Sequence, residues 1–157
     1  MNTENVKLDE LDKRILTALQ EDATRTNQEL AALVHASAPT CLRRVKRLSE
    51  SGVIARQVAI LSPASVAAGL TAIVEITLDV QSSERWVEFE LLVSGEPAIQ
   101  QCYRVSPGPD FVLILQVADM AAYHALAHRL FANHANVRNV RSFFSVVRSK
   151  FDTRIPI

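Results

Sequence analysis

Apolar residues in the first third of the chain recur with the three- and four-residue spacing of amphipathic helices. The first stripe predicts a helix over residues 9–21, and its members are Leu8, Leu11, Ile15, Leu16 and Leu19. A second helix is expected to begin at Thr26, because Thr26 and Glu29 have the spacing of a capping box. The apolar face expected for this helix consists of Leu30, Leu33 and Val34.

A tight turn at residues 35–37 leads to a third predicted helix. Ser37 is its expected N-cap, and Pro39 lies in the first turn, where a missing N–H costs nothing. Gly52 is expected to end the helix. The residues expected to face the core are Leu42, Val45 and Leu48. Three helices of this kind predict a winged-type helix-turn-helix domain over residues 1–52.

From residue 53 onwards the period changes from helical spacing to the alternation of strands. Residues 53–61 predict a strand inside a connecting segment, 53–65. Beyond it, strands are predicted over 71–80, 99–105, 111–118 and 137–147, and helices over 82–94 and 119–132. The order strand, helix, strand, strand, helix, strand is that of a ferredoxin-like βαββαβ domain, here residues 66–157. The overall fold class is therefore α+β.

The predicted strand at 111–118 is apolar on both faces. Phe111, Leu113 and Leu115 alternate with Val112 and Ile114. In this fold both helices cover the same face of the sheet, so the other face is left open. We therefore expect a second copy of the chain to cover it, which makes the protein at least a dimer.

Only the third predicted helix has a charge pattern that bears on function. The whole chain has 17 basic and 17 acidic residues and a pI near 6.9, so it carries no global basic surface. The third helix nevertheless has four cations within residues 43–47 and no acidic residue between Ser37 and Leu48. A charge run is usually a solvated face, but such faces mix signs, as the first helix does. The pattern favours binding to double-stranded DNA, and the residues expected to contact it are Ser37, Thr40, Arg43, Arg44, Lys46 and Arg47.

Several stretches, in conserved order and spacing, resemble the leucine-responsive regulatory protein (Lrp)/AsnC family of transcription regulators over nearly the whole chain. The matching stretches start at Leu8-Asp9-x-x-Asp12, Thr26-Asn27-x-Glu29, Ser37-x-x-Thr40-Cys41-Leu42, Gly52-Val53-Ile54, Ser62-Pro63, Val74-Glu75-Ile76 and Val117-x-Asp119-Met120. The resemblance implies an N-terminal DNA-binding domain and a C-terminal domain that assembles the oligomer. It also implies dimers that build tetramers of dimers, and an effector that is often an amino acid.

The resemblance breaks in the loop before the predicted third strand of the second domain. Family members usually read Gly-Asp-x-Asp-Tyr there, whereas this chain reads Ser106-Pro-Gly108-Pro-Asp110-Phe. The loop borders the effector pocket in the family, and a simple rigid turn is the alternative reading. If an effector binds, the residues expected to contact it at a subunit interface are Ser106, Gly108, Asp110 and Ser142.

Other chemistries have little support in the sequence. His124 and His128 lie four residues apart, but neither a cysteine nor a well-spaced carboxylate joins them, so we expect no metal site. No nucleotide-binding or nucleophile motif is present, so no cofactor and no catalytic residue are expected. Cys41 and Cys102 are expected to be buried thiols. The alternatives are an assembly or ligand-binding module with little DNA role, and an enzyme of ferredoxin-like fold, which would leave residues 1–50 unexplained.

The expected compartment is the cytoplasm. The first seven residues are polar, unlike a secretory leader. No apolar run approaches the roughly 18 to 20 residues that span a bilayer, so no membrane contact is expected.

Overall fold

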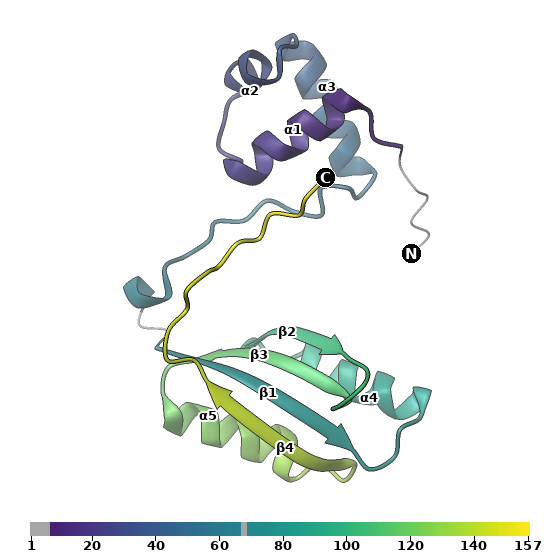
Figure 1. Cartoon of the computed structure of the whole chain (residues 1–157), viewed down its shortest axis with the longest axis vertical. Coiled ribbons are helices and arrows are strands. Elements are labelled where there is room, and N and C mark those ends of the chain that lie inside the picture. Colours follow the sequence, from purple (N-terminus) through teal and green to yellow (C-terminus); the bar gives the residue numbers. More distant parts are fainter. Residues whose placement is uncertain (1–6, 67–68) are drawn as a thin grey trace. The chain divides into compact units, whose positions relative to one another are not determined.

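A computed structural model describes residues 7–66 and 69–157, which form two compact units (Figure 1). The first unit contains the chain up to Ile60 together with the C-terminal tail, Lys150–Ile157. The second unit is Leu61–Ser149. In this single chain the tail groups with the helical unit, while the domain bounds 66–157 stay a prediction.

The first unit is a three-helix domain whose helices begin at polar caps. These helices are α1 (Glu10–Glu21), α2 (Asn27–Val34) and α3 (Ala38–Glu50). The predicted capping box of Thr26 and Glu29 is present, and Ser37 caps α3 by accepting from the backbone N–H of Thr40. Asp9 and Asp12 form a second capping box at the start of α1, which was not among the predicted caps. The core of this unit includes Ile15, Leu30, Val34, Cys41 and Leu48.

Two leucines that the sequence analysis assigned to this core lie outside it. Leu33 is 51% exposed and Leu42 is 56% exposed. In α3 the buried stripe runs through Cys41 and Leu48, with Val45 half-buried, so it is rotated by one residue at its start. Cysteine is often buried, and here it takes the core position that was assigned to the larger leucine.

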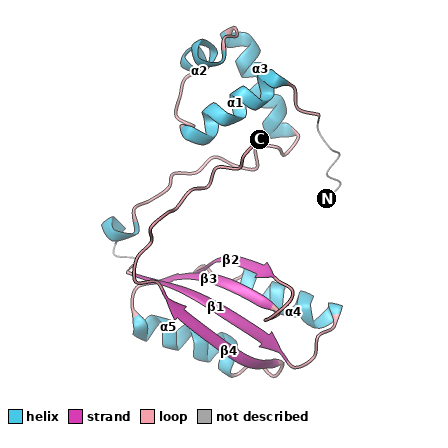
Figure 2. Cartoon of the chain, in the orientation of Figure 1, coloured by secondary structure: helices cyan, strands magenta, loops and turns pink. Residues whose placement is uncertain are grey.

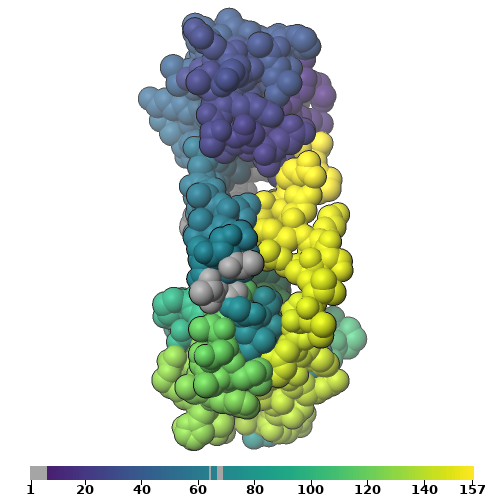
Figure 3. Space-filling model, turned by 90° about the vertical axis from the view of Figure 1, so that its left-hand side faces the viewer, coloured from purple at the N-terminus to yellow at the C-terminus, as the bar shows by residue number. Residues whose placement is uncertain are grey.

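The side-chain amide of Gln20 in α1 forms two hydrogen bonds with the C-terminal tail. The Nε2 group of Gln20 donates to the Ile155 carbonyl oxygen at 3.1 Å, and its Oε1 accepts from the Ile155 backbone N–H at 2.6 Å. This pairing satisfies both polar backbone groups of one extended residue, as a neighbouring strand would. The rest of the tail is exposed and forms the yellow end of the chain in Figure 3.

The strand predicted over residues 53–61 is not formed within this chain. Residues 55–62 have no regular secondary structure and are drawn as loop in Figure 2. A strand requires a backbone partner, and none of the strand pairings of the described residues involves this segment. A wing after α3 is therefore absent from the described residues of this single chain. A short 3-10 helix, η1 (Pro63–Val66), follows, and residues 67–68 lie outside the described residues.

The second unit has the predicted βαββαβ order. Its strands are β1 (Leu70–Leu78), β2 (Ile99–Arg104), β3 (Phe111–Val117) and β4 (Val137–Phe144). All neighbouring pairs are antiparallel, and the strand order is β2-β3-β1-β4. The helices are α4 (Ser83–Ser94) and α5 (Met120–Ala127), which continues as a π-helical turn, η2 (His128–Ala132).

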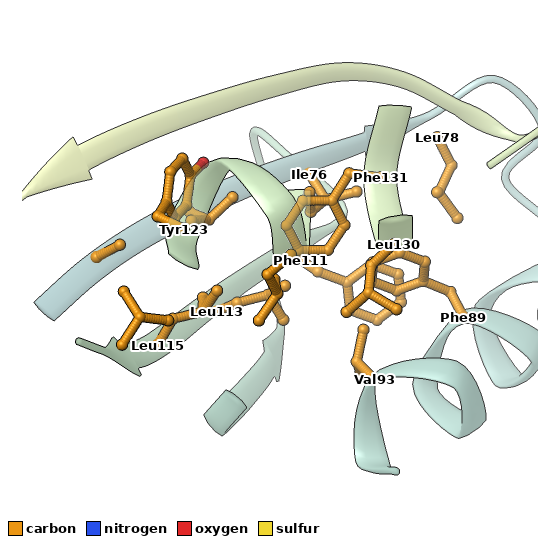
Figure 4. Close-up of a cluster of buried hydrophobic side chains, with 14 residues drawn as sticks. Ile76, Leu78, Phe89, Val93, Phe111, Leu113, Leu115, Tyr123, Leu130 and Phe131 are labelled. Carbon is orange, nitrogen blue, oxygen red and sulfur yellow. The ribbon is translucent and has the colours of Figure 1, made fainter. Parts of the chain in front are cut away.

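Both helices cover one face of this sheet (Figure 1). The core between the helices and the sheet contains Phe89 of α4 and Phe111 of β3, whose ring centroids lie 4.8 Å apart. Figure 4 shows how the buried side chains from strands and helices meet in this layer. The expected ferredoxin-like arrangement is therefore confirmed.

The opposite face of the sheet carries apolar side chains that this chain leaves partly open. Val112 and Ile114 are half-buried, while Ile73 is 38% and Phe143 is 43% exposed. Strand register places Ile73 between Ile114 and Phe143, so the three side chains form a row across the sheet. We call this row, together with Val112 and Tyr103 beside it, the outer sheet face.

In residues 7–66 and 69–157, no helix combines the length and the apolar character that crossing a bilayer requires.

Candidate nucleic-acid interface and effector region

The second and third helices of the first unit meet in a tight turn that has the geometry of a helix-turn-helix. His35 ends α2 with a left-handed backbone, at a φ of 53°, and Ser37 starts α3 two residues later. The Ser37 and Thr40 hydroxyl oxygens lie 2.8 Å apart at the N-terminus of α3. The structure thus brings together two of the predicted DNA-binding residues at the end of the helix that reads base edges in this motif.

The four cations of α3 are not equivalent. Arg44 is only 20% exposed, and its Nη1 donates to Asp9 Oδ2 at 2.7 Å and to Asp12 Oδ1 at 3.3 Å. Arg47 pairs with the other oxygen of Asp12 through its Nη2 and remains 43% exposed. Both Asp9 and Asp12 come from the start of α1, so they tie the first helix to the third. We call these four residues the α1–α3 ion network.

Asp12 is the centre of this network. Its side chain is fully buried, although the mixed charges of the first helix indicated a solvated face. Burying a carboxylate is costly unless it is paired, and here two guanidinium groups and the backbone N–H of Asp9 contact it. The D-x-x-D spacing of the capping box was the available signal, because it turns the second aspartate back towards the helix start.

The ion network also affects protonation at its rim. The backbone N–H of Asp12 and then the Arg44 guanidinium hold the pKa of Asp9 below its ordinary value. Asp9 in turn raises the pKa of Arg44. Because the folded pKa of Asp9 is lowered, its stabilising effect is fully present above about pH 3.9 and is lost as the pH falls through the lowered value.

The remaining cations lie on the outer side of α3. Arg43 is exposed, and no ion-pair partner for it occurs among the residues that the structure describes. Lys46 is exposed as well and has only a loose contact, 3.7 Å, with Glu50 one turn later. These two side chains are therefore available to an external anion, while Arg44 is engaged inside the domain.

Asp110 does not lie open in the loop where an effector is expected. It is 7% exposed, and its carboxylate accepts from the Leu78 backbone N–H at 2.7 Å and from Trp86 Nε1 at 3.2 Å. Gln81 Nε2 donates to it at 3.3 Å. Both oxygens are thus occupied from within the chain, and they join the end of β1 to α4.

The other predicted effector residues have different surroundings. Ser142 pairs with Val74 in the sheet, and its hydroxyl contacts the hydroxyl of Tyr123 in α5. Ser106 and Gly108 are exposed in the loop between β2 and β3, where Gly108 has a φ of +120°. Asp110 faces α4 while Ser142 faces α5, so one chain by itself does not bring the four residues into one pocket.

The residues considered for metal or redox chemistry are dispersed. His124 and His128 are exposed on the outer side of α5 and the turn that follows it. Within the described residues, no group of three His, Cys, Asp or Glu side chains is placed to hold a metal ion. Cys41 is buried as expected, but the expectation for Cys102 was wrong: it is exposed, because β2 is the edge of the sheet.

Comparison with known proteins agrees with a DNA-binding regulator of two domains. The AsnC-type helix-turn-helix domain model matches residues 8–49, and the Lrp/AsnC ligand binding domain model matches residues 71–155. The DNA-binding transcriptional activator DecR of Escherichia coli is 34% identical over 150 residues, which cover 96% of this chain and 99% of that protein.

Two solved structures are similar over nearly the whole chain. An AsnC family transcriptional regulator from Agrobacterium tumefaciens has a TM-score of 0.88 and 38% identity, covering 95% of this chain and 97% of that one. A transcriptional regulator from Neisseria meningitidis, solved as an L-methionine complex, has a TM-score of 0.89 and 31% identity, covering 96% and 97%. The chain belongs to the Lrp/AsnC family: it is a DNA-binding transcriptional regulator with a ligand-binding domain.

Proposed function

We propose that this regulator contacts DNA through the outer side and the N-terminus of α3. The residues assigned to the contact are Ser37, Thr40, Arg43, Lys46 and the exposed part of Arg47. The observation that carries the proposal is the division of the basic run: Arg44 is held by Asp9 and Asp12, while Arg43 has no ion-pair partner in the part of the chain that the structure describes. In this proposal Arg44 shapes the domain and contributes little to the phosphate contacts.

A gel shift with the full-length chain and the DNA upstream of its own coding sequence tests the proposal. We expect a shift that weakens steeply as salt rises, because phosphate contacts release counterions. Failure to shift this DNA and random duplexes at micromolar protein would favour the alternative, an assembly or ligand-binding module. Because the proposed binding partner is genomic DNA, we place the protein in the cytoplasm.

We also propose that the outer sheet face is the homodimer interface, and that dimers assemble further into a tetramer of dimers. The support is the row of apolar side chains at Ile73, Ile114 and Phe143, with the Glu75–Arg141 ion pair beside it at 3.2 Å. An apolar centre with charged groups around it is the usual composition of such an interface. A two-fold dimer would present two copies of α3 to half-sites about 34 Å apart.

Replacing Ile114 by Asp is expected to convert the dimer into a monomer. The new carboxylate would be buried against the partner without a counter-charge, so we expect the dimer dissociation constant to rise at least about 100-fold. Light scattering of the full-length chain over micromolar concentrations measures it. The matched control is Leu91→Asp, because Leu91 is 70% exposed on α4, away from the outer sheet face. Dissociation by the Leu91 variant alone would refute this interface.

We propose further that the regulator is modulated by a small molecule such as an amino acid. The support is the match to the ligand-binding domain and the L-methionine complex of the Neisseria relative. We assign the direct contacts to Ser106 and to the backbone N–H of Gly108, which are exposed. Asp110 and Ser142 would hold the elements behind the loop, because their polar atoms already have partners.

A thermal-denaturation screen of the twenty amino acids, with L-methionine first, tests this assignment. A ligand at 100 times its dissociation constant should stabilise the protein by about 2.7 kcal/mol. Ser106→Ala should weaken binding about two- to tenfold through one lost hydrogen bond. The control is Ser94→Ala, which removes an exposed hydroxyl of α4. Binding that is unchanged in Ser106→Ala and in a Gly108→Val variant would place the pocket elsewhere.

A further inference from the structure

Leu42 is an exposed apolar side chain at the edge of the α3 face that carries Arg43 and Lys46. It is 56% exposed although the residues before and after it along the core stripe, Cys41 and Leu48, are fully buried. A single exposed leucine on an ordinary surface has no special meaning. This one lies on α3, which is the second helix of the helix-turn-helix, and in that motif the second helix lies in the major groove.

The position of Leu42 within α3 places it beside Arg43 and Lys46 rather than beside the two arginines of the ion network. Residues three and four apart share a helix face, so Leu42 adjoins Pro39 and Lys46, and Arg43 follows it directly. Arg44 and Arg47 lie on the flank held by Asp9 and Asp12. Leu42 is thus on the opposite flank from the ion network.

Leu42 also lies in the first half of α3, near the Ser37 and Thr40 hydroxyls. The N-terminal part of a recognition helix is the part that contacts base edges in the major groove. Arg43 and Lys46 would draw this face towards the phosphates on either side. An apolar side chain carried into the groove has one complementary feature on the bases, the C5-methyl group of thymine.

We propose that Leu42 is a specificity-determining residue that selects thymine by contact with its C5-methyl group. The inference rests on the proposed placement of α3 in the major groove. The recognition helix would then make two kinds of contact with bases: polar side chains would form hydrogen bonds, and one apolar side chain would contact methyl groups. The methyl contact also gives a role to a leucine that the core does not use.

The test compares thymine with uracil, which lacks only the methyl group. The probe is a duplex recovered from a random library by the full-length chain, synthesised once with thymidine and once with deoxyuridine. The wild-type chain should bind the thymidine duplex about fourfold more tightly for each methyl group that Leu42 covers. The Leu42→Ala variant should bind both duplexes equally, with wild-type affinity for the deoxyuridine form.

Two further variants make the test specific. Leu33→Ala removes a leucine of similar exposure, 51%, from α2 and should keep the full preference for thymine. Leu42→Met keeps an apolar side chain and should restore part of the preference. Equal binding of both duplexes by the wild type, or an unchanged preference in Leu42→Ala, would overturn the proposal. Recovery of no duplex at all would instead refute the DNA-binding face itself.

Discussion

Replacing Asp12 by Asn is expected to lower the free energy of unfolding of the helical unit by about 2–3 kcal/mol. The asparagine has nearly the same shape, but it leaves the half-buried Arg44 without its buried counter-charge. Loss of one partner of a fully buried pair costs more, and the partial exposure of both arginines reduces the effect here.

Urea unfolding with two probes measures this change. Far-ultraviolet circular dichroism follows the helices of both units, while Trp86, the single tryptophan, reports only on the second unit, so a transition seen by dichroism alone belongs to the helical unit. We expect Asp12→Asn to move the unfolding transition of the helical unit to lower urea. The matched control is Glu10→Gln, whose carboxylate is 86% exposed, and its effect should stay within about 0.5 kcal/mol. An unchanged dichroism midpoint for Asp12→Asn would contradict the role given to the ion network.

The second large effect is expected at Arg43. Arg43→Ala should weaken binding to a specific site by about tenfold or more if the guanidinium reads a base edge. If it contacts a phosphate, the slope of log affinity against log salt should fall by about one. Arg44→Ala should instead destabilise the helical unit and leave the slope near that of the wild type, because Arg44 already pairs with Asp9 and Asp12.

Salt-dependent gel shifts and melting temperatures of the same variants separate these outcomes. Arg14→Ala is the matched control, because Arg14 is an exposed arginine of α1 in the same unit. It should change neither quantity measurably. A fall in the salt slope of Arg44→Ala as large as that of Arg43→Ala would show that the four cations act alike.

Local signals in the sequence predicted the starts of the elements well. Ser37 caps α3 as expected, and the helices predicted over 82–94 and 119–132 begin directly after their caps Ser82 and Asp119, because a cap depends on residues within one turn. Periodicity was less exact in α3. Cys41 and Leu42 are adjacent and both apolar, and spacing alone does not decide which of two neighbours faces the core.

Contacts between distant parts of the chain were not accessible in this way. The burial of Asp12 depends on two arginines of another helix, and that of Asp110 depends on the indole of Trp86. The sequence placed Asp12 among mixed surface charges and Asp110 in an effector site, because the partners of both aspartates lie far away in the sequence. The segment 53–61 has a strand-like composition, but its secondary structure depends on a backbone partner that its own residues do not supply.

The ion network has a consequence for how the regulator searches a genome. A protein that seeks one operator competes with millions of other sequences, all of which offer the same phosphates. Asp9 and Asp12 lie beside the recognition helix and neutralise part of its positive charge. This lower positive charge weakens non-specific DNA binding, which rests on phosphate contacts, more than it weakens specific binding, which also rests on contacts with bases. The two aspartates are thus expected to shorten the time lost on wrong sequences, at some expense in total affinity.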